Sequence, residues 1–508
     1  MRPTQQHWLL VMKVFLEGDT MAEENSTKRP LVSLLSTEFI ERIIGEAKDV
    51  LEKVGVWVEN EEALELLGNG GAQIDRGKKK VFIPKRLVEE SLKSVPSSIK
   101  LYDRNGSLDM DSEEKDFYAN GMPTPTVWDS ELNQFRKSLT EDAINHIKLV
   151  DALDNIDGQL PFYGTELPKE VWDCHKVCLS LRYSTKSIEA CLYAKESFEV
   201  FKDLLVTIRG SEEALREKPL LMLPVCPSPP LKWTDLCCHA LIRGAENWIP
   251  AILIPMPLSG ATAPVTIGGC VVQHAAENLT GVVISQLTNR GSSIIWGASP
   301  VVFDMHWGTT PLGALETVMM NIACNEVGKY LGMPTGVTVG CDAKRPDSQS
   351  GLEMGMGTIL ASLSGAKVIS GQGMLNFENT QSLEKMVIDN EICGMARRLA
   401  QGITPRGERL AEDLFTEGLY EGDHFLLSPT TMKWFREEFF YPGPVISREK
   451  DQVWIEKGAT TAEQRAKEEV KRILATHQPE PLDKDVDREL IRIMTRAAAK
   501  YGMDKPPL

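Results

Sequence analysis

The chain has 508 residues, of which 42% are hydrophobic and 25% are charged, and its formal net charge is −16 at pH 7. This composition is typical of a globular protein with a large core, and the negative charge argues against binding of nucleic acid or acidic lipid. No apolar run approaches the roughly 18 residues that span a bilayer, so we expect a cytoplasmic protein with no membrane partner.

The first part of the chain is predicted to hold an extension and a small α+β unit. A lysine interrupts the apolar stretch near the N-terminus and no small-residue cleavage site follows it, so residues 1–30 are expected to form a disordered extension. Residues 31–115 alternate between helical and strand patterns and form the predicted N-terminal α+β subdomain. Within it, IKLYDRNGSLDM (99–110) predicts a hairpin around Asn105-Gly106.

Residues 116–402 alternate between apolar strands and helices, which predicts βα units and a parallel sheet. Eight such units favour an α/β fold of the (β/α)8 TIM-barrel type over an open sheet. No GxGxxG motif follows the first strand, which weakens a dinucleotide-binding alternative. The eight predicted strands lie in residues 116–121, 156–167, 186–193, 220–231, 250–260, 293–305, 334–344 and 366–375.

Residues 403–508 are predicted to be an irregular region followed by helices that pack on the barrel. The irregular part is rich in aromatic residues and proline, and two charged helices follow it. The last helix, within 485–502, carries its apolar residues on one side. This pattern leaves two interpretations open, packing on the same chain or a homo-oligomer interface.

The functional residues of a TIM barrel lie at the C-terminal ends of its strands. Here these ends carry many aromatic side chains, several acids and almost no inward cation. That combination suits a small organic cation, which ring faces attract and carboxylates neutralise. We predict Asp304, His306 and Asp342 as catalytic residues and, as substrate-binding residues, Tyr118, Tyr163, Glu166, Trp296, Trp307, Cys341, Gln372 and Phe377.

Two groups of soft ligands raise the question of zinc. They are Cys174-His175-x-x-Cys178 and Cys237-Cys238-His239. No second ligand pair stands at zinc spacing from either group. Both groups also lie within amphipathic helix patterns, where a buried cysteine acts as a small hydrophobe. We therefore predict no bound metal.

Three segments resemble a known family. They are GVWVENEEALELLGNGGAQID (55–75), GASPVVFDMHWGTTPLGALE (297–316) and GVTVGCDAK (336–344) with the PDSQSGLE that follows. All three are similar to the trimethylamine methyltransferase family of corrinoid-dependent enzymes, and the resemblance extends from about residue 31 to the C-terminal helices.

The resemblance implies an activity and a partner. Members of the family are TIM barrels that move a methyl group from a methylated amine to the Co(I) corrinoid (cobalamin) of a cognate corrinoid protein. The barrel itself would bind no cofactor tightly. The methanogen trimethylamine enzymes carry pyrrolysine in this barrel, whereas this sequence has standard residues throughout. The chain is thus similar to the non-pyrrolysine branch, whose substrates are quaternary amines such as glycine betaine, proline betaine, carnitine or butyrobetaine.

Two alternatives stay open. A zinc-dependent corrinoid methyltransferase for another methyl donor could use His306 and Cys341 as ligands, although a quaternary ammonium needs no Lewis acid to release its methyl group. The other alternative is a non-catalytic betaine-binding barrel.

Overall fold

The computed structural model describes residues 28–406, 410–417, 425 and 428–508. Most of the expected N-terminal extension, residues 1–27, lies outside the described residues.

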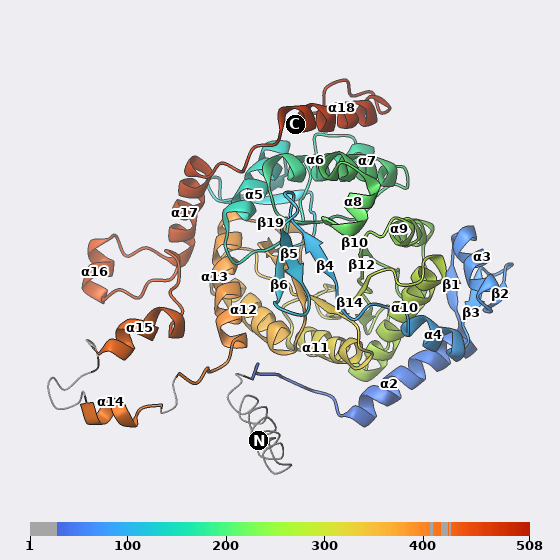
Figure 1. The fold of residues 1–508 in the computed structure, drawn as a ribbon, viewed down its shortest axis with the longest axis horizontal. Helices are drawn as coiled ribbons and strands as arrows, with labels where there is room; N and C mark the ends of the chain where they lie inside the picture. The colour runs from blue at the N-terminus through green and yellow to red at the C-terminus, as the bar shows by residue number, and fades with distance from the viewer. Residues whose placement is uncertain (1–27, 407–409, 418–424, 426–427) are drawn as a thin grey trace, which may run out of the picture.

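A curled sheet of seven parallel strands lies at the centre of the molecule (Figure 1). Its strands run in the order β6-β17-β16-β14-β12-β10-β9, and every neighbouring pair is parallel. Each strand falls within one of the predicted ranges. The bounds are β6 (Phe117–Asn120), β9 (Ile188–Glu189), β10 (Leu221–Val225), β12 (Ala251–Leu253), β14 (Ile294–Ala298), β16 (Thr335–Thr338) and β17 (Val368–Gln372).

The remaining predicted strand, in 156–167, is reduced to isolated bridges. Gly158 pairs with Ala119 of β6, and the next residue, Gln159, pairs with Ile188 of β9, both in parallel. The segment therefore contacts both edge strands of the curled sheet. It ends early because the Asn120 side chain, not a strand, accepts the hydrogen bond of the Leu160 N–H at 2.7 Å.

Helices surround the sheet (Figure 1). They alternate with the strands, as βα units require, except that α8 directly follows α7. Residues on the outer faces of the strands pack against these helices, and residues on the inner faces form a separate apolar cluster. The surrounding helices are α5 (Thr140–Ala152), α6 (Trp172–Tyr183), α7 (Ser197–Arg209), α8 (Glu212–Glu217), α9 (Asp235–Glu246), α10 (Ile267–Thr288), α11 (Leu315–Tyr330), α12 (Ser348–Leu363) and α13 (Leu383–Ala400).

The predicted hairpin is present and closes one end of the sheet. Strands β4 (Lys100–Tyr102) and β5 (Leu108–Asp111) flank a turn in which Gly106 has a φ of 85°. The hairpin contributes Leu101 and Met110 to the interior cluster, where they join Phe117 and Val368, the first residues of β6 and β17. The hairpin thus fills the end where the strands begin, and the opposite end is left for a site.

The N-terminal unit packs on α10. Its small sheet has the order β11-β1-β3-β2. Strand β11 (Lys232–Trp233) comes from the loop after β10, so the N-terminal unit shares this sheet with the region of the curled sheet. Its other elements are α2 (Thr37–Asp49), the π-helix η1 (Val50–Val54), β1 (Val56–Val58), α3 (Glu61–Asn69), β2 (Gln73–Asp75), β3 (Lys80–Phe82) and α4 (Lys85–Leu92).

The C-terminal helices pack on the same chain. Helix α17 (Ala462–Thr476) contacts α13 and α5, and α18 (Lys484–Ala499) contacts α6 and α7. The apolar side of α18 thereby joins the main core through Leu490 and Met494. The shorter helices α14 (Glu412–Glu417), α15 (Pro429–Glu438) and α16 (Asp451–Glu456) lie further from the sheet (Figure 1).

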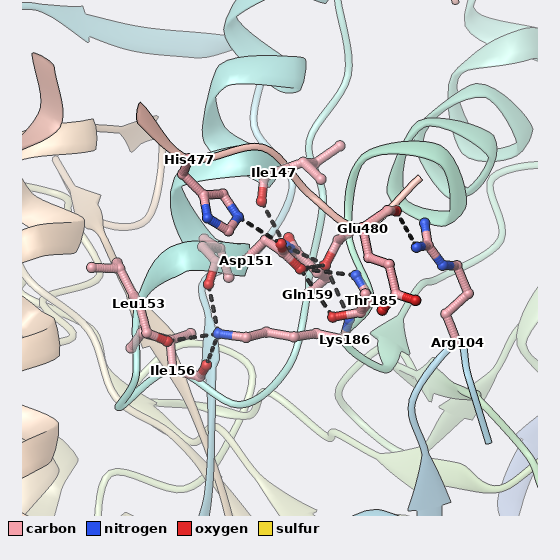
Figure 2. A network of polar contacts seen from close by, with 12 residues as sticks. Arg104, Ile147, Asp151, Leu153, Ile156, Gln159, Thr185, Lys186, His477 and Glu480 are labelled. Carbon is pink, nitrogen blue, oxygen red and sulfur yellow. Dashed lines mark hydrogen bonds and ion pairs between the residues drawn. The ribbon is translucent and has the colours of Figure 1, made fainter. Parts of the chain in front are cut away.

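A polar network joins the end of α5, the start of β9 and the segment between α17 and α18 (Figure 2). The Lys186 ammonium donates to the backbone carbonyls of Val150, Leu153 and Ile156 at 2.6, 2.6 and 2.5 Å. Asp151 accepts from the Thr185 backbone N–H, and the His477 ring lies 2.8 Å from its other oxygen. Lys186 thus binds carbonyls at and just beyond the C-terminal end of α5, where the helical hydrogen bonds stop.

Candidate functional site

The loops after β16 and β17 meet at the C-terminal end of the sheet. In the second loop, Asn376, Phe377 and Glu378 have φ of 54°, 57° and 59°. A left-handed conformation costs a non-glycine residue about 1–2 kcal/mol. Two hydrogen bonds to the first loop stabilise this conformation of the second loop. The Asn376 N–H donates to the Ala343 carbonyl at 2.8 Å, and the Phe377 N–H donates to the Cys341 carbonyl at 3.0 Å. Such strain is concentrated at functional sites, and it directs attention to these two loops.

Asp342 fixes the first loop to the segment that precedes α11. Its carboxylate accepts from the backbone N–H groups of Leu312 at 2.7 Å and Gly313 at 3.2 Å. The backbone N–H of Asp342 in turn donates to the Glu353 carboxylate of α12 at 2.7 Å. Burial raises the pKa of Asp342 to about 6, although the two N–H donors oppose that rise. Asp342 is therefore mostly ionised at pH 7, and its lone pairs largely serve the backbone.

Glu378 is the second carboxyl group of this site. Burial and, to a smaller extent, the charge of Asp342 raise the pKa of Glu378 to about 8. Its Oε1 is buried without a hydrogen-bond partner. Glu378 is therefore mostly protonated at pH 7, and a cation placed beside it would favour the ionised form.

An aromatic ring and an ammonium group complete this part of the site. The Nζ of Lys344 lies 3.8 Å from the centre of the Phe377 ring and donates to the Asp342 carbonyl at 2.5 Å. The ring of Phe377 thus already contacts one ammonium group. Ring faces attract cations in general, so a cationic ligand at this ring would lie close to Lys344.

A second aromatic group lies at the ends of the strand segments near 160 and 190. The rings of Tyr163 and Trp172 stack at 4.1 Å with an interplanar angle of 10°, and Tyr193 meets Tyr163 edge-on at 6.0 Å. Trp172 is the first residue of α6, so a helix start supplies one ring and the strand ends supply the others. These rings form an apolar wall with polar tips.

Comparison with known proteins decides the family. Residues 17–502 match the family described as trimethylamine methyltransferase (MTTB). The chain belongs to the trimethylamine methyltransferase family. It is 31% identical to trimethylamine methyltransferase MttB of Desulfitobacterium hafniense, over 90% of this chain and 92% of the relative. It is also 29% identical to MttB of Methanosarcina barkeri, over 95% of this chain and 98% of the relative.

Two further proteins extend the comparison. Glycine betaine methyltransferase of Desulfitobacterium hafniense is 27% identical over 93% of this chain and 98% of the relative. The solved structure of the monomethylamine methyltransferase of Methanosarcina barkeri aligns with 95% of this chain and 97% of the relative's chain. The aligned residues are 12% identical, and the TM-score is 0.46. The prediction that this family member is a methyltransferase is confirmed by the family match.

The sequence-predicted residues of this family member fall into separate groups. Phe377 and Asp342 lie together in the strained loops, and Tyr163 belongs to the aromatic wall. Glu166 is exposed and accepts from the Thr140 N–H at 2.7 Å, at the start of α5. Cys341 and Gln372 are both fully buried, and neither amide atom of Gln372 has a partner.

Two predicted rings point into the helical layer and not toward the two loops. The Trp296 indole N–H donates to the Cys324 carbonyl of α11 at 3.0 Å. Tyr118 is fully buried, and the guanidinium of Arg397 from α13 lies 5.0 Å from its ring centre. Neighbouring residues of a strand face opposite sides, so a strand-end aromatic has no fixed direction until its register is known.

Asp304, His306 and Trp307 form one exposed turn. The Asp304 carboxylate accepts from the backbone N–H groups of His306 at 2.8 Å and Trp307 at 3.1 Å. Trp307 is 75% exposed, with its ring edge-on to His306. The turn stands on a short parallel pair, β13 (Leu258–Ser259) and β15 (Val301–Val302). It is a rim feature, separate from the strained loops.

The residues that sequence reasoning missed are Glu378 and Trp172. Glu378 directly follows Phe377, and the left-handed turn that positions it has no clear signal in the residues LNFEN.

Among the described residues, no group of three or more His, Cys, Asp or Glu side chains could hold a metal ion. The two residues considered as zinc ligands differ in burial, because His306 is exposed while Cys341 is buried. Within the same residues, no helix has the length and apolarity to cross a bilayer.

Proposed function

We propose that this protein moves a methyl group from a quaternary amine to the Co(I) corrinoid of a cognate partner protein. Glycine betaine is the first candidate substrate, followed by proline betaine, carnitine and butyrobetaine. The observation that carries the proposal is the pair of carboxyl groups, Asp342 and Glu378, beside the Phe377 ring in a strained part of the site. The proposal treats the sheet as a closed (β/α)8 barrel, in keeping with the bridges at Gly158 and Gln159.

A quaternary amine fits this chemistry better than a tertiary one. Its nitrogen is already positive, so attack on the methyl carbon releases a neutral tertiary amine and needs no proton at the departing nitrogen. The protein then has to bind, orient and keep the methyl group in line with the acceptor. The similarity to a glycine betaine methyltransferase and the standard residues throughout the chain support this substrate class.

Each side chain has a defined task in the proposal. The ionised form of Glu378 balances the ammonium charge, the Phe377 ring contacts its methyl groups, and Asp342 is a positioning residue for the two loops. Because the positive charge disappears in the transition state, a ring contact is better suited than a tight ion pair. The exposed turn of Asp304, His306 and Trp307 would face the incoming corrinoid protein at the rim.

The test is methyl transfer in a defined mixture. The purified protein is incubated with reduced cobalamin and one amine at a time, glycine betaine, proline betaine, carnitine, butyrobetaine or trimethylamine, and methyl–cobalt absorbance is followed. We expect one quaternary amine to react fastest. Trimethylamine as the best substrate would overturn the proposed class, and no transfer from any amine would favour a betaine-binding protein.

A further inference from the structure

A thiol at the edge of the aromatic wall has an unusual neighbour. Ile188 of β9 joins the main core, and so do Ala190 and Leu192, which follow the end of that strand at Glu189. Cys191 lies between Ala190 and Leu192, in the segment that follows β9. It is half-buried, and the adjacent Tyr193 is 40% exposed, so small molecules can approach from solvent.

The neighbour is the ammonium group of Lys176 in α6. Its Nζ lies 3.6 Å from the Cys191 Sγ and 4.5 Å from the centre of the Tyr193 ring. The Lys176 side chain is fully buried, and across the described residues no carboxylate lies within ion-pair distance of it. A buried cation needs a partner, and the sulfur of Cys191 is the acceptor that Lys176 has. A lysine next to a thiol stabilises its thiolate, which is the nucleophilic form.

The remaining cysteines differ from Cys191 in their surroundings. The chain has ten cysteines. Burial raises the thiol pKa of each of the other nine, namely Cys174, Cys178, Cys226, Cys237, Cys238, Cys270, Cys324, Cys341 and Cys393. Such thiols are chemically inert near neutral pH. Besides Lys176, the titratable groups that interact with Cys191 are Tyr163, Tyr193, Cys226 and Cys237.

We propose that Cys191 is a nucleophilic modification site, activated by Lys176, that reacts with low-molecular-weight disulfides at the edge of the barrel mouth. The Cys191 thiolate attacks one sulfur of the disulfide. That sulfur–sulfur bond breaks as the new one to Cys191 forms, and the released thiolate takes a proton from water. Cys191 is oxidised and the leaving sulfur is reduced, so an added thiol reverses the step.

The modification has a consequence that rests on the proposed function. A group attached to Cys191 lies beside Tyr193 and Tyr163 and would obstruct the aromatic wall. Methyl transfer to Co(I) requires reducing conditions. Oxidising conditions remove the Co(I) acceptor of the methyl group. Under the same conditions a disulfide would form at Cys191 and stop the protein from binding the amine.

The test measures labelling directly and does not need activity. The full-length protein is treated with bis(2-hydroxyethyl) disulfide at pH 7, and modified peptides are quantified by mass spectrometry over time. We expect Cys191 to react at least about tenfold faster than any other cysteine, because it is a half-buried thiol with an ammonium group beside it. Lys176→Met should remove most of that advantage, and Lys176→Arg should restore it. Cys270→Ser, the matched control at a buried cysteine outside this group, should leave the rate at Cys191 unchanged.

The outcomes separate this inference from the proposed function. Equal labelling of Cys191 and the other cysteines, or fast labelling that persists in a folded Lys176→Met variant, would overturn it whatever the enzyme does. If the protein transfers methyl groups, the disulfide should inhibit it, dithiothreitol should restore it, and Cys191→Ser should be active and insensitive. Inhibition that persists in Cys191→Ser would contradict the stated consequence.

Discussion

Asp342 and Glu378 interact electrostatically across the two loops that follow β16 and β17. The charge of Asp342 contributes to raising the pKa of Glu378, whose buried oxygen has no partner. Asp342 accepts two backbone hydrogen bonds and holds the loops together, whereas the Oε1 of Glu378 is still able to accept a hydrogen bond or contact a cation. Two carboxyl groups in one site thus have different tasks because their surroundings differ.

The first prediction concerns the pH dependence of amine binding. A cation bound beside Glu378 favours the ionised carboxylate, so binding below pH 8 must release a proton from Glu378. The affinity for glycine betaine should therefore fall as the pH drops below about 8, approaching tenfold per unit, and level off above it. Titration calorimetry from pH 6.5 to 9 measures this dependence.

The matched variant for this prediction is Glu378→Gln, which keeps the shape and removes the titration. It should bind more weakly at pH 9 and show little pH dependence. An affinity of the wild type that is constant from pH 6.5 to 9 would mean that the ammonium group binds elsewhere.

The second prediction compares two aromatic residues. Phe377 lies in the strained loop under an ammonium group, whereas Trp307 is 75% exposed on the rim. Phe377→Leu should raise the KM for the amine about tenfold, because a cation–π contact contributes about 1–2 kcal/mol. Trp307→Leu should leave that KM within about twofold. Steady-state kinetics with varied amine distinguishes them, and a larger effect of Trp307→Leu would place the amine at the rim.

The sequence predicted the order of strands and helices well because apolar runs and their lengths are local properties. Seven predicted strands form the sheet, and the Asn105-Gly106 hairpin is where it was expected. Side-chain direction was harder to predict, because a shift of one residue turns a side chain to the other face. Trp296 and Tyr118 point into the helical layer for this reason. Glu378 depends on a left-handed turn that is held by the neighbouring loop, which no local pattern encodes.

The third prediction concerns the network around Lys186 (Figure 2). Lys186→Met would remove the ammonium donor from the carbonyls of Val150, Leu153 and Ile156, of which Val150 keeps the hydrogen bond from the Leu153 N–H. Unsatisfied buried carbonyls cost about 1–3 kcal/mol each, and partial relaxation should leave a total loss of about 3 kcal/mol. Thermal unfolding followed by circular dichroism should show a clearly lower midpoint. Lys78→Met, at a side chain that is 79% exposed, is the control and should change little. An unchanged midpoint for Lys186→Met would show that water replaces the ammonium group.

The last prediction concerns Glu189, the last residue of β9. Glu189 is 3% exposed, both of its carboxyl oxygens lack a partner, and burial raises its pKa to about 7 from the usual 4.5. Below pH 4.5 the group is protonated in both the folded and the unfolded chain, and it contributes no pH dependence. Between pH 4.5 and 7 only the unfolded chain ionises, so the stability of the folded state falls as the pH rises. The full loss, about 3 kcal/mol, is reached above pH 7.

Glu189→Gln removes this dependence while keeping the shape of the side chain. The other buried acids titrate in both proteins, so the difference in free energy of unfolding between wild type and variant isolates Glu189. Relative to the wild type, the variant should gain stability between pH 4.5 and 7 and then hold a constant difference. Urea unfolding at pH 4.5, 6 and 8 measures it, with Glu468→Gln, at a side chain that is 75% exposed, as the control. A difference that does not change with pH would show that Glu189 ionises as readily in the folded chain as in the unfolded one.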